Sequence, residues 1–167
     1  MAKVTLPRAI LAVVAAGATA FGIMQESVPI LEANPLVAYQ DIGGVWTICG
    51  GVTYGVKRGD VETVEGCKQR NAAAINIGLA AVNRCVSYPM PETRRAAFGL
   101  MAYNVGGSAF CKSTAAKLAN AGRSAEACAQ IDRWVYVAGK DCRLKASNCA
   151  GIVHRRAIER TLCEVGL

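Results

Sequence analysis

The sequence predicts an α+β fold with two lobes, in which a small antiparallel sheet is joined by a long helix to a group of helices. Its 167 residues suffice for one domain with a sizeable core. Between residues 36 and 56, Val, Tyr, Trp and Thr are interrupted by two Gly-Gly pairs, as in short strands with tight turns. From residue 64 onward, apolar residues recur at mostly helical spacing. We therefore expect a cleft between the lobes.

A basic end and an apolar run precede these elements. Lys3 and Arg8 are followed by the uncharged residues 9–25, and this pattern directs a chain to a membrane with its basic end inside. The run is short for a membrane span and rich in Ala and Gly, so its affinity for lipid is low.

The chain is therefore expected to have two parts. Residues 1–25 are an N-terminal anchor, held transiently in the inner membrane through residues 9–24, and residues 26–167 are the folded domain. Two alternatives remain open, namely a signal peptide cleaved before Phe21 and an incidental apolar tail.

Helix signals divide the remainder of the chain. Thr63 or Asp60 is a plausible cap for one long helix to about Cys85. Pro91 occupies the first position of a second helix, which runs to Tyr103 and stops at a Gly-Gly pair. Further helices are expected from Ser113 to near Gly122, from Ser124 to near Gly139 and from Gly151 to Glu164.

The chain is basic, with 19 Lys and Arg residues against 12 Asp and Glu. Because the leader holds only Lys3 and Arg8 of these cations, the folded domain is itself basic. Such a charge favours an anionic partner, for example a membrane surface or a cell-wall polymer. No run of Lys or Arg interleaves Trp46, Tyr54 or Trp134, so no nucleic-acid partner is expected.

Eight cysteines favour an oxidising compartment. No C-x-x-C spacing occurs, and His154 is the single histidine, so neither a metal nor a cofactor is expected. Eight cysteines allow 105 pairings, among which spacing alone cannot choose. The one local candidate pair is Cys142 with Cys149. The others are Cys49, Cys67, Cys85, Cys111, Cys128 and Cys163.

Two carboxylates and a hydroxyl are candidates for the catalytic residues of a glycosidase. An exported, basic, disulfide-rich domain with a cleft suits a carbohydrate polymer as substrate, and glycosidic hydrolysis commonly needs two carboxylates held across the bond. Glu32 lies just before the sheet region, and Asp41 and Thr47 lie within it. Taken alone, this spacing also fits solvated surface groups.

The surrounding residues are more specific. The segment LEANPLVAYQDIGGVWTICGG resembles the active-site segment of phage-type lysozymes, glycoside hydrolase family 24. Downstream, AYNVGGSAFCKSTAAKLANAG resembles the helical-lobe stretch of that family, and Trp134 followed by GIVHRRAIERTLC resembles its closing Trp and Arg-Arg helix. The leader is similar to that of signal-arrest-release endolysins in the same family.

This resemblance implies a lysozyme-like two-lobed fold and a muramidase activity. The expected reaction is hydrolysis of the β-1,4 bond between N-acetylmuramic acid and N-acetylglucosamine in peptidoglycan during host-cell lysis. The expected enzyme is a monomer that moves from the periplasmic face of the host inner membrane into the periplasm. A lytic transglycosylase, a wall peptidase using a thiol with His154, and a non-catalytic wall-binding module are the alternatives.

Residue roles also follow from the resemblance. Glu32 is expected to be the general acid, and Asp41 is expected to activate water with Thr47 as its partner. These roles correspond to an inverting mechanism. Arg155 is expected near Glu32, where its charge would lower the acid's pKa unless burial outweighs it. Asn104 is expected to support substrate binding.

Two features depart from the simplest family pattern. Val52 stands where many members have a histidine, and we expect this loss to be structural because the three catalytic candidates are intact. The additional cysteines suggest that Cys85 pairs with Cys111 and Cys142 with Cys149 within the helical lobe. That pairing leaves Cys49 with Cys67, and Cys128 with Cys163.

Overall fold

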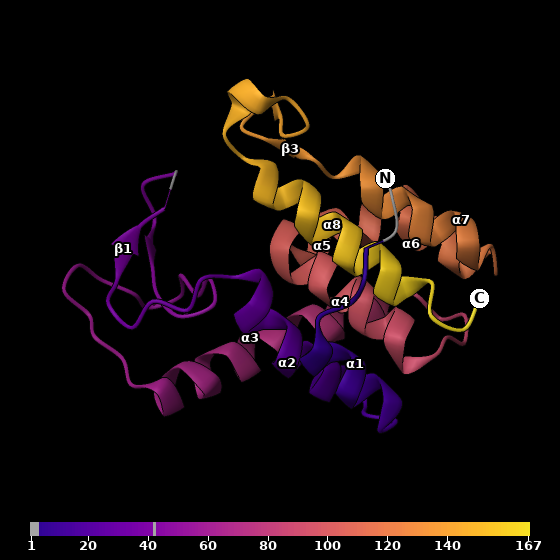
Figure 1. Cartoon of the computed structure of the whole chain (residues 1–167), viewed down its shortest axis with the longest axis horizontal. Helices are drawn as coiled ribbons and strands as arrows, with labels where there is room; N and C mark the ends of the chain where they lie inside the picture. Colours follow the sequence, from indigo (N-terminus) through magenta and orange to yellow (C-terminus); the bar gives the residue numbers. More distant parts are fainter. Residues whose placement is uncertain (1–3, 42) are drawn as a thin grey trace.

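The computed structural model describes residues 4–41 and 43–167, so Lys3 of the leader lies outside the described residues. A sheet lobe and a larger helical lobe face each other, and α3 extends from one to the other (Figure 1). The helices are α1 (Arg8–Ala15), α2 (Ala20–Leu31), α3 (Val64–Cys85), α4 (Glu92–Val105), α5 (Gly107–Lys112), α6 (Thr114–Asn120), α7 (Ser124–Ala129) and α8 (Ala150–Cys163), with 3-10 turns η1 (Gln130–Arg133) and η2 (Lys145–Ser147). The strands are β1 (Tyr39–Gln40), β2 (Trp46–Thr47), β3 (Tyr136–Val137) and β4 (Lys140–Asp141). The predicted α+β fold is confirmed.

The leader forms two helices that turn between residues 16 and 19. Ile10 of α1 and Ile23 and Met24 of α2 are buried in the main core. The Thr19 side chain caps α2 by accepting a hydrogen bond from the Gly22 amide, and Glu92 of α4 accepts another from the Ala20 amide at 2.6 Å. Among the described residues, no helix is long and apolar enough to cross a membrane. In this structure the apolar run is part of the protein core.

The sheet lobe is small and is held by a disulfide. Strands β1 and β2 pair antiparallel, with Tyr39 opposite Thr47. Isolated bridges join Val37 to Val61 and Ile48 to Val52. Ile48 and the Cys49–Cys67 disulfide form a separate core cluster beneath the sheet. The strands are shorter than the predicted region, because turns, isolated bridges and irregular segments interrupt it.

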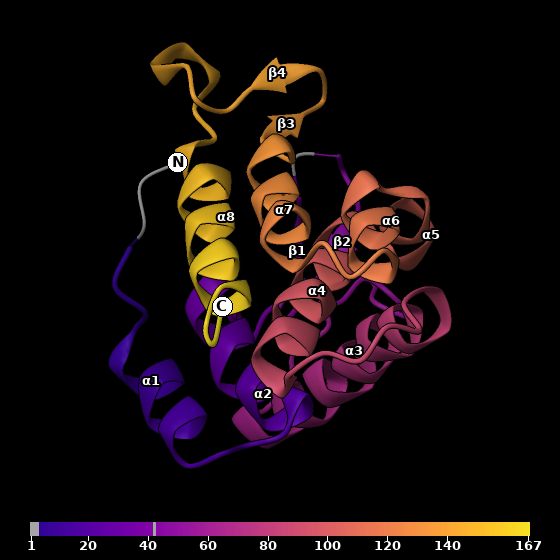
Figure 2. The same ribbon diagram turned by 90° about the vertical axis from the view of Figure 1, so that its right-hand side faces the viewer.

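Helix α4 is the centre of the helical lobe. Phe98, Leu100 and Met101 have no exposed surface, and Phe98 packs on Phe110 of α5 with ring centroids 5.6 Å apart. Helices α2, α3, α5 and α8 all contact α4, and Figure 2 shows α8 and α4 alongside each other above α2. The long linking helix α3 is as long as predicted, since it begins after the Thr63 cap and ends at Cys85.

Two helix predictions need correction, and one short helix was missed. The helix expected from Ser124 to near Gly139 ends at Ala129, and after η1 the chain forms the β3–β4 hairpin. Tyr136 and Val137 favour a strand, and the turn is made by Ala138 and Gly139, both with positive φ. Pro91 is the N-cap of α4 and not its first residue. Helix α5 was not predicted, because only one turn separates Gly106 from Ser113.

All eight cysteines form disulfides. The pairs are Cys49–Cys67, Cys85–Cys111, Cys128–Cys163 and Cys142–Cys149, which are the pairs suggested by the family resemblance. Cys128–Cys163 ties α7 to the end of α8, and Cys142–Cys149 closes the loop between β4 and α8. By the chain-entropy argument each contributes about 2 to 4 kcal/mol to the free energy of unfolding.

This arrangement predicts the result of thiol labelling. Protein that is fully active before it is denatured without reduction should bind no thiol reagent, because every cysteine sulfur is paired. Reduction before labelling should add eight labels, which mass spectrometry would count. Two or more labels on unreduced, fully active protein would contradict this pairing.

Candidate active site

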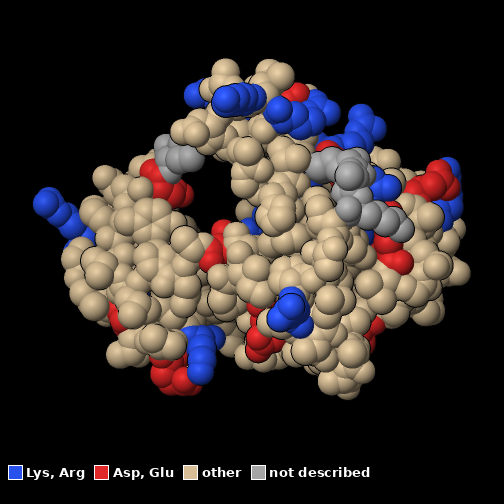
Figure 3. Space-filling view, viewed as in Figure 1, with Lys and Arg blue, Asp and Glu red and all other residues tan. Residues whose placement is uncertain are grey.

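A cavity of about 800 Å³ lies between the two lobes. The sheet side contributes Glu32, Tyr39, Asp41 and Gly43, and the helical side contributes Asn104, Val105, Trp134, Tyr136, Val137, Ala138, Ile152 and Arg156. Figure 3 shows a deep opening between the lobes with acidic side chains on its border. The structure thus brings Glu32, Asp41 and Asn104 to one cleft.

Glu32 follows the last residue of α2. Its amide still bonds the Val28 carbonyl at 2.8 Å, while its own backbone is extended, so the chain leaves the helix at this residue. Its carboxylate accepts a hydrogen bond from Nη1 of Arg155, and 23% of the side chain is exposed. Glu32 is therefore a mostly buried carboxylate at the base of the cleft, with a cation on one side.

Arg155 belongs to a buried ionic network on α8. Its Nε donates to Glu159 at 2.8 Å, and Glu159 also accepts from Arg156. Arg156 in turn donates to Asn104 and to the Trp134 carbonyl. Burial lowers the pKa of Arg155, but the charges of Glu159 and Glu32 outweigh it and raise that pKa overall. The network therefore keeps Arg155 charged while sharing its charge between two carboxylates.

Asp41 lies at the turn between β1 and β2. Its Oδ1 accepts hydrogen bonds from the Gly43 amide at 2.8 Å and the Val45 amide at 2.9 Å. Gly44 completes the turn with φ +75°, a conformation that favours glycine. Amide donors hold the Asp41 carboxylate in place, and it forms no ion pair with a Lys or Arg among the described residues.

Thr47 is buried and does not line the cavity. Its hydroxyl donates to the Val45 carbonyl at 3.0 Å, while the Val45 amide donates to Asp41. Thr47 therefore braces the turn that holds Asp41. Of the three predicted catalytic residues, two face the cleft and the third supports one of them from the strand behind.

Two tyrosines near the carboxylates were missed by the sequence analysis. Tyr39 lines the same cavity as Glu32 and Asp41. Burial, followed by the charges of Glu32 and Asp41, raises the pKa of Tyr39. Tyr103 of α4 donates to the Gly50 carbonyl at 2.6 Å. Burial and then the charge of Glu32 raise the pKa of Tyr103 to about 12. No sequence signal distinguishes these tyrosines from ordinary core residues.

Gly50 is held from both sides, which fixes the sheet lobe beside Glu32. Its amide donates to Asn71 of α3 at 3.0 Å, and its carbonyl accepts from Tyr103. A Cβ at Gly50 would lie 2.7 Å from Val28, so no larger residue fits against α2. The next residue, Gly51, faces the Glu32 carboxyl carbon. Residues on α2, α3 and α4 thus meet at one loop.

Two other sequence candidates lie outside the cleft. His154 is exposed on α8 and does not line the cavity. Val52, which replaces the family histidine, forms a two-way backbone bridge with Ile48. Within the described residues, no group of three or more His, Cys, Asp or Glu side chains could hold a metal ion.

A cleft that presents two carboxylates from separate elements, here the end of α2 and the β1–β2 turn, is an arrangement typical of glycosidases. The phage lysozyme family model matches residues 30–159. A probable prophage lysozyme of Escherichia coli K12 is 37% identical over 94% of this chain and 92% of its own length. A SAR-endolysin of Escherichia phage 933W is 35% identical over 97% of this chain and 94% of its own length. The muramidase domain of SpmX from Asticaccaulis excentricus superposes with a TM-score of 0.74 at 26% identity, over 84% of this chain and 94% of that domain. The chain belongs to the phage lysozyme family.

The Tyr103 hydrogen bond predicts a pH-dependent loss of stability. At pH 7, Tyr103→Phe should lower the free energy of unfolding by about 1 to 3 kcal/mol, because the Gly50 carbonyl loses its donor. Between pH 10 and 12 the unfolded tyrosine loses its proton while the folded one retains it, so the parent should lose on the order of 2 kcal/mol that the variant does not.

Urea unfolding at several pH values measures this difference. Tyr54→Phe is the control, since Tyr54 is 93% exposed. A gap between parent and Tyr103→Phe that stays constant from pH 7 to 12 would contradict the buried, hydrogen-bonded hydroxyl.

Proposed function

We propose that this protein is an endolysin, a muramidase that hydrolyses the β-1,4 bond between N-acetylmuramic acid and N-acetylglucosamine in peptidoglycan. The observation that supports this most is that Glu32 and Asp41 face one cleft from different elements, in a chain of the phage lysozyme family. One carboxylate lies against a shared cation, and the other is held by backbone amides. Glycosidic hydrolysis needs two such unlike carboxylates.

In the proposed reaction Glu32 is the general acid. It donates its proton to the glycosidic oxygen as the bond to the anomeric carbon breaks. Asp41 accepts a proton from the water that attacks that carbon from the opposite face, which inverts its configuration. Thr47 contributes by bracing Val45 and thereby the Asp41 turn.

Arg155 donates a hydrogen bond to Glu32, and two further features shape the surroundings of the proposed acid. Glu159 binds the same guanidinium, so part of its charge is already compensated. A glycan seated over Glu32 would also exclude water from a side chain that is already mostly buried. A bound glycan would therefore complete the enclosure of the proposed acid.

A lytic transglycosylase is less well supported. That reaction needs one acid and no attacking water, and it releases a 1,6-anhydro product. The two amides aimed at Asp41 would then have no catalytic purpose. Mass analysis of the digest distinguishes the reactions, because hydrolysis leaves a reducing end that is one water heavier.

The proposed roles predict the activity of two variants. Glu32→Gln should reduce lysis by about 1,000-fold or more while the protein still folds, because the amide keeps the shape and still accepts a hydrogen bond from Arg155 but supplies no proton. Asp41→Asn should reduce lysis by the same factor or a smaller one. Turbidity loss of purified peptidoglycan measures both.

Glu26→Gln is the matched control, since it makes the same change on an exposed part of α2. Near-normal lysis by Glu32→Gln would show that another group is the acid.

We also propose that the leader withholds activity until it leaves the membrane. Residues 20–31 form one helix that ends at Glu32, so the apolar run and the acid cannot be positioned independently. While residues 9–24 are in lipid, α2 cannot pack on α4 and the cleft is incomplete. Release lets α2 fold onto the domain in the periplasm, and loss of the membrane potential would favour release. The relatives named SAR-endolysin match this chain across the leader as well.

Cleavage before Phe21 is the less favoured alternative. It would remove Leu6, Ile10 and Ala20, which are buried in the core. The uncleaved chain therefore gives the better-packed enzyme.

The release hypothesis can be tested on α1. Ala12→Leu/Ala15→Leu adds membrane affinity of about 0.5 kcal/mol per residue at positions exposed in the folded protein. This variant should stay in the membrane fraction and lyse cells poorly. Gly17 is unsuitable, because its φ of +70° would strain a leucine.

Ala12→Gln/Ala15→Gln is the control at the same positions and should lyse cells at least as fast as the parent. Recovery of active protein only as a chain beginning at Phe21 would contradict the release hypothesis, though not the proposed chemistry.

A further inference from the structure

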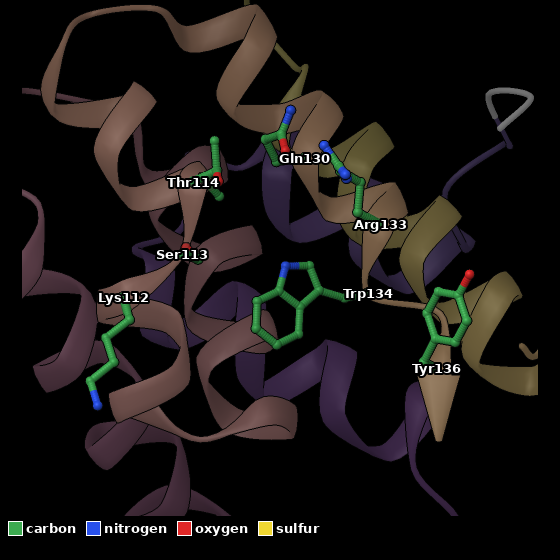
Figure 4. A pocket seen from close by; sticks show the side chains of 8 residues that line it. Lys112, Ser113, Thr114, Gln130, Arg133, Trp134 and Tyr136 are labelled. Carbon is green, nitrogen blue, oxygen red and sulfur yellow. The ribbon is translucent and has the colours of Figure 1, made fainter. Parts of the chain in front are cut away.

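The two walls of the cleft are held in place in different ways. On the helical wall, the indole ring of Trp134 extends into a second cavity of about 550 Å³, which Ser113 and Thr114 also line (Figure 4). The Trp134 carbonyl accepts a hydrogen bond from Arg156 of α8 at 2.9 Å, so helices support this wall. Glu32, on the other wall, has a helix only on its N-terminal side, because its own backbone is extended. The segment that follows Glu32 needs support from elsewhere in the fold.

Asn71 of α3 supplies this support with both ends of its side-chain amide. Its Oδ1 accepts a hydrogen bond from the Gly50 amide at 3.0 Å, and its Nδ2 donates to Oδ1 of Asn34 at 3.4 Å. Asn34 follows shortly after Glu32 in the chain, and only 6% of Asn71 is exposed. One buried side chain therefore joins the segment that carries the acid to the loop at Gly50.

That loop lies directly against the acid. A Cβ at Gly51 would lie 3.9 Å from the carboxyl carbon of Glu32, which is ordinary van der Waals contact. A Cβ at Gly50 would lie 2.9 Å from Oδ1 of Asn71, so the loop backbone and Asn71 are tightly packed. A loop that moved away from Asn71 would leave space beside the Glu32 carboxyl group and let it turn.

Helix α3 binds the same loop a second time, one turn before Asn71. Cys67 lies on the same face of α3 as Asn71 and forms the disulfide with Cys49, the residue before Gly50. The Cys49 amide also donates to the Pro35 carbonyl at 2.9 Å. Two successive turns of α3 thus hold two successive residues of the loop, one through a disulfide and the other through a hydrogen bond.

We infer that Asn71 is a positioning residue for the general acid, which it orients through the Gly50–Gly51 loop and through Asn34. The inference rests on the proposed function, which makes Glu32 the acid. A proton donor must point at the glycosidic oxygen, and a misplacement of about 1 Å costs on the order of 100-fold in rate. Asn71 does not line the cleft, so it acts on proton donation and not on glycan binding.

The test measures kcat and KM separately on soluble, uncrosslinked peptidoglycan strands. Asn71→Leu removes both hydrogen bonds and keeps a side chain of similar size. Its kcat should fall about 10- to 100-fold, while KM stays within about twofold of the parent value because every residue that lines the cleft is retained.

Two further variants separate the contacts of Asn71. Asn71→Asp still accepts from the Gly50 amide, and it accepts from the Asn34 amide once that group turns over, so kcat should return to within about fivefold of the parent. Asn34→Ala removes only the contact beside the acid, and its kcat should fall about three- to tenfold. This milder variant also tests the inference if Asn71→Leu does not fold.

Ile75→Ala is the matched control for lost stability, since Ile75 is buried in the main core one turn further along α3. It should lower the unfolding temperature at least as much as Asn71→Leu and keep the parent kcat, with all variants assayed well below their unfolding temperatures. Parent-like kcat in the folded Asn71 and Asn34 variants, a rise in KM as their only defect, or an equal fall of kcat in Ile75→Ala would overturn the inference. A parent enzyme that releases no reducing ends from the strands would instead overturn the proposed function.

Discussion

The active site depends on the packing of α2 against α4, because α2 ends at Glu32. Met24 lies so close to Gly99 that an added Cβ would come within 2.5 Å of the methionine sulfur. Val28 lies one turn further along α2 and is similarly close to Gly50, where an added Cβ would lie 2.7 Å from the valine side chain. Ile10, Ile23 and Met24 of the leader's apolar run are thus also residues of the main core. Under the release hypothesis, lipid and α4 compete for this surface of α2, and only packing on α4 completes the cleft.

The groups that surround Glu32 and Asp41 come from two different elements, helix α8 and the β1–β2 turn. Glu159 has no exposed surface and joins Arg155 to Arg156, so α8 presents one guanidinium to Glu32 and another to Asn104. Removing one member of such a buried network leaves an uncompensated charge. Asp41 is held instead by backbone amides in a turn. The two carboxylates therefore sit in unlike surroundings, as an acid and a base acting on one bond require.

Local patterns predicted much of this fold, and long-range contacts account for what they missed. The Thr63 cap and apolar periodicity located α3 correctly, whereas the helix expected to Gly139 failed because Ala138 and Gly139 make a turn that helix periodicity does not reveal. Glu32, Asp41 and Asn104 were found through family resemblance, and the structure brings them to one cleft. Tyr103 and Glu159 were missed, since their roles depend on partners that folding brings near: Gly50 lies 53 residues from Tyr103, and Glu32 reaches Glu159 only through Arg155.

The most direct test of the account is amide hydrogen exchange along residues 20–31 in soluble, full-length, active enzyme. If α2 is the core element that positions Glu32, its amides should be protected nearly as strongly as those of α4, with exchange free energies close to that of global unfolding. Exchange of residues 23–31 at the rate of an unfolded peptide, in enzyme that retains full activity, would contradict the account, because the cleft would then function without α2 in place.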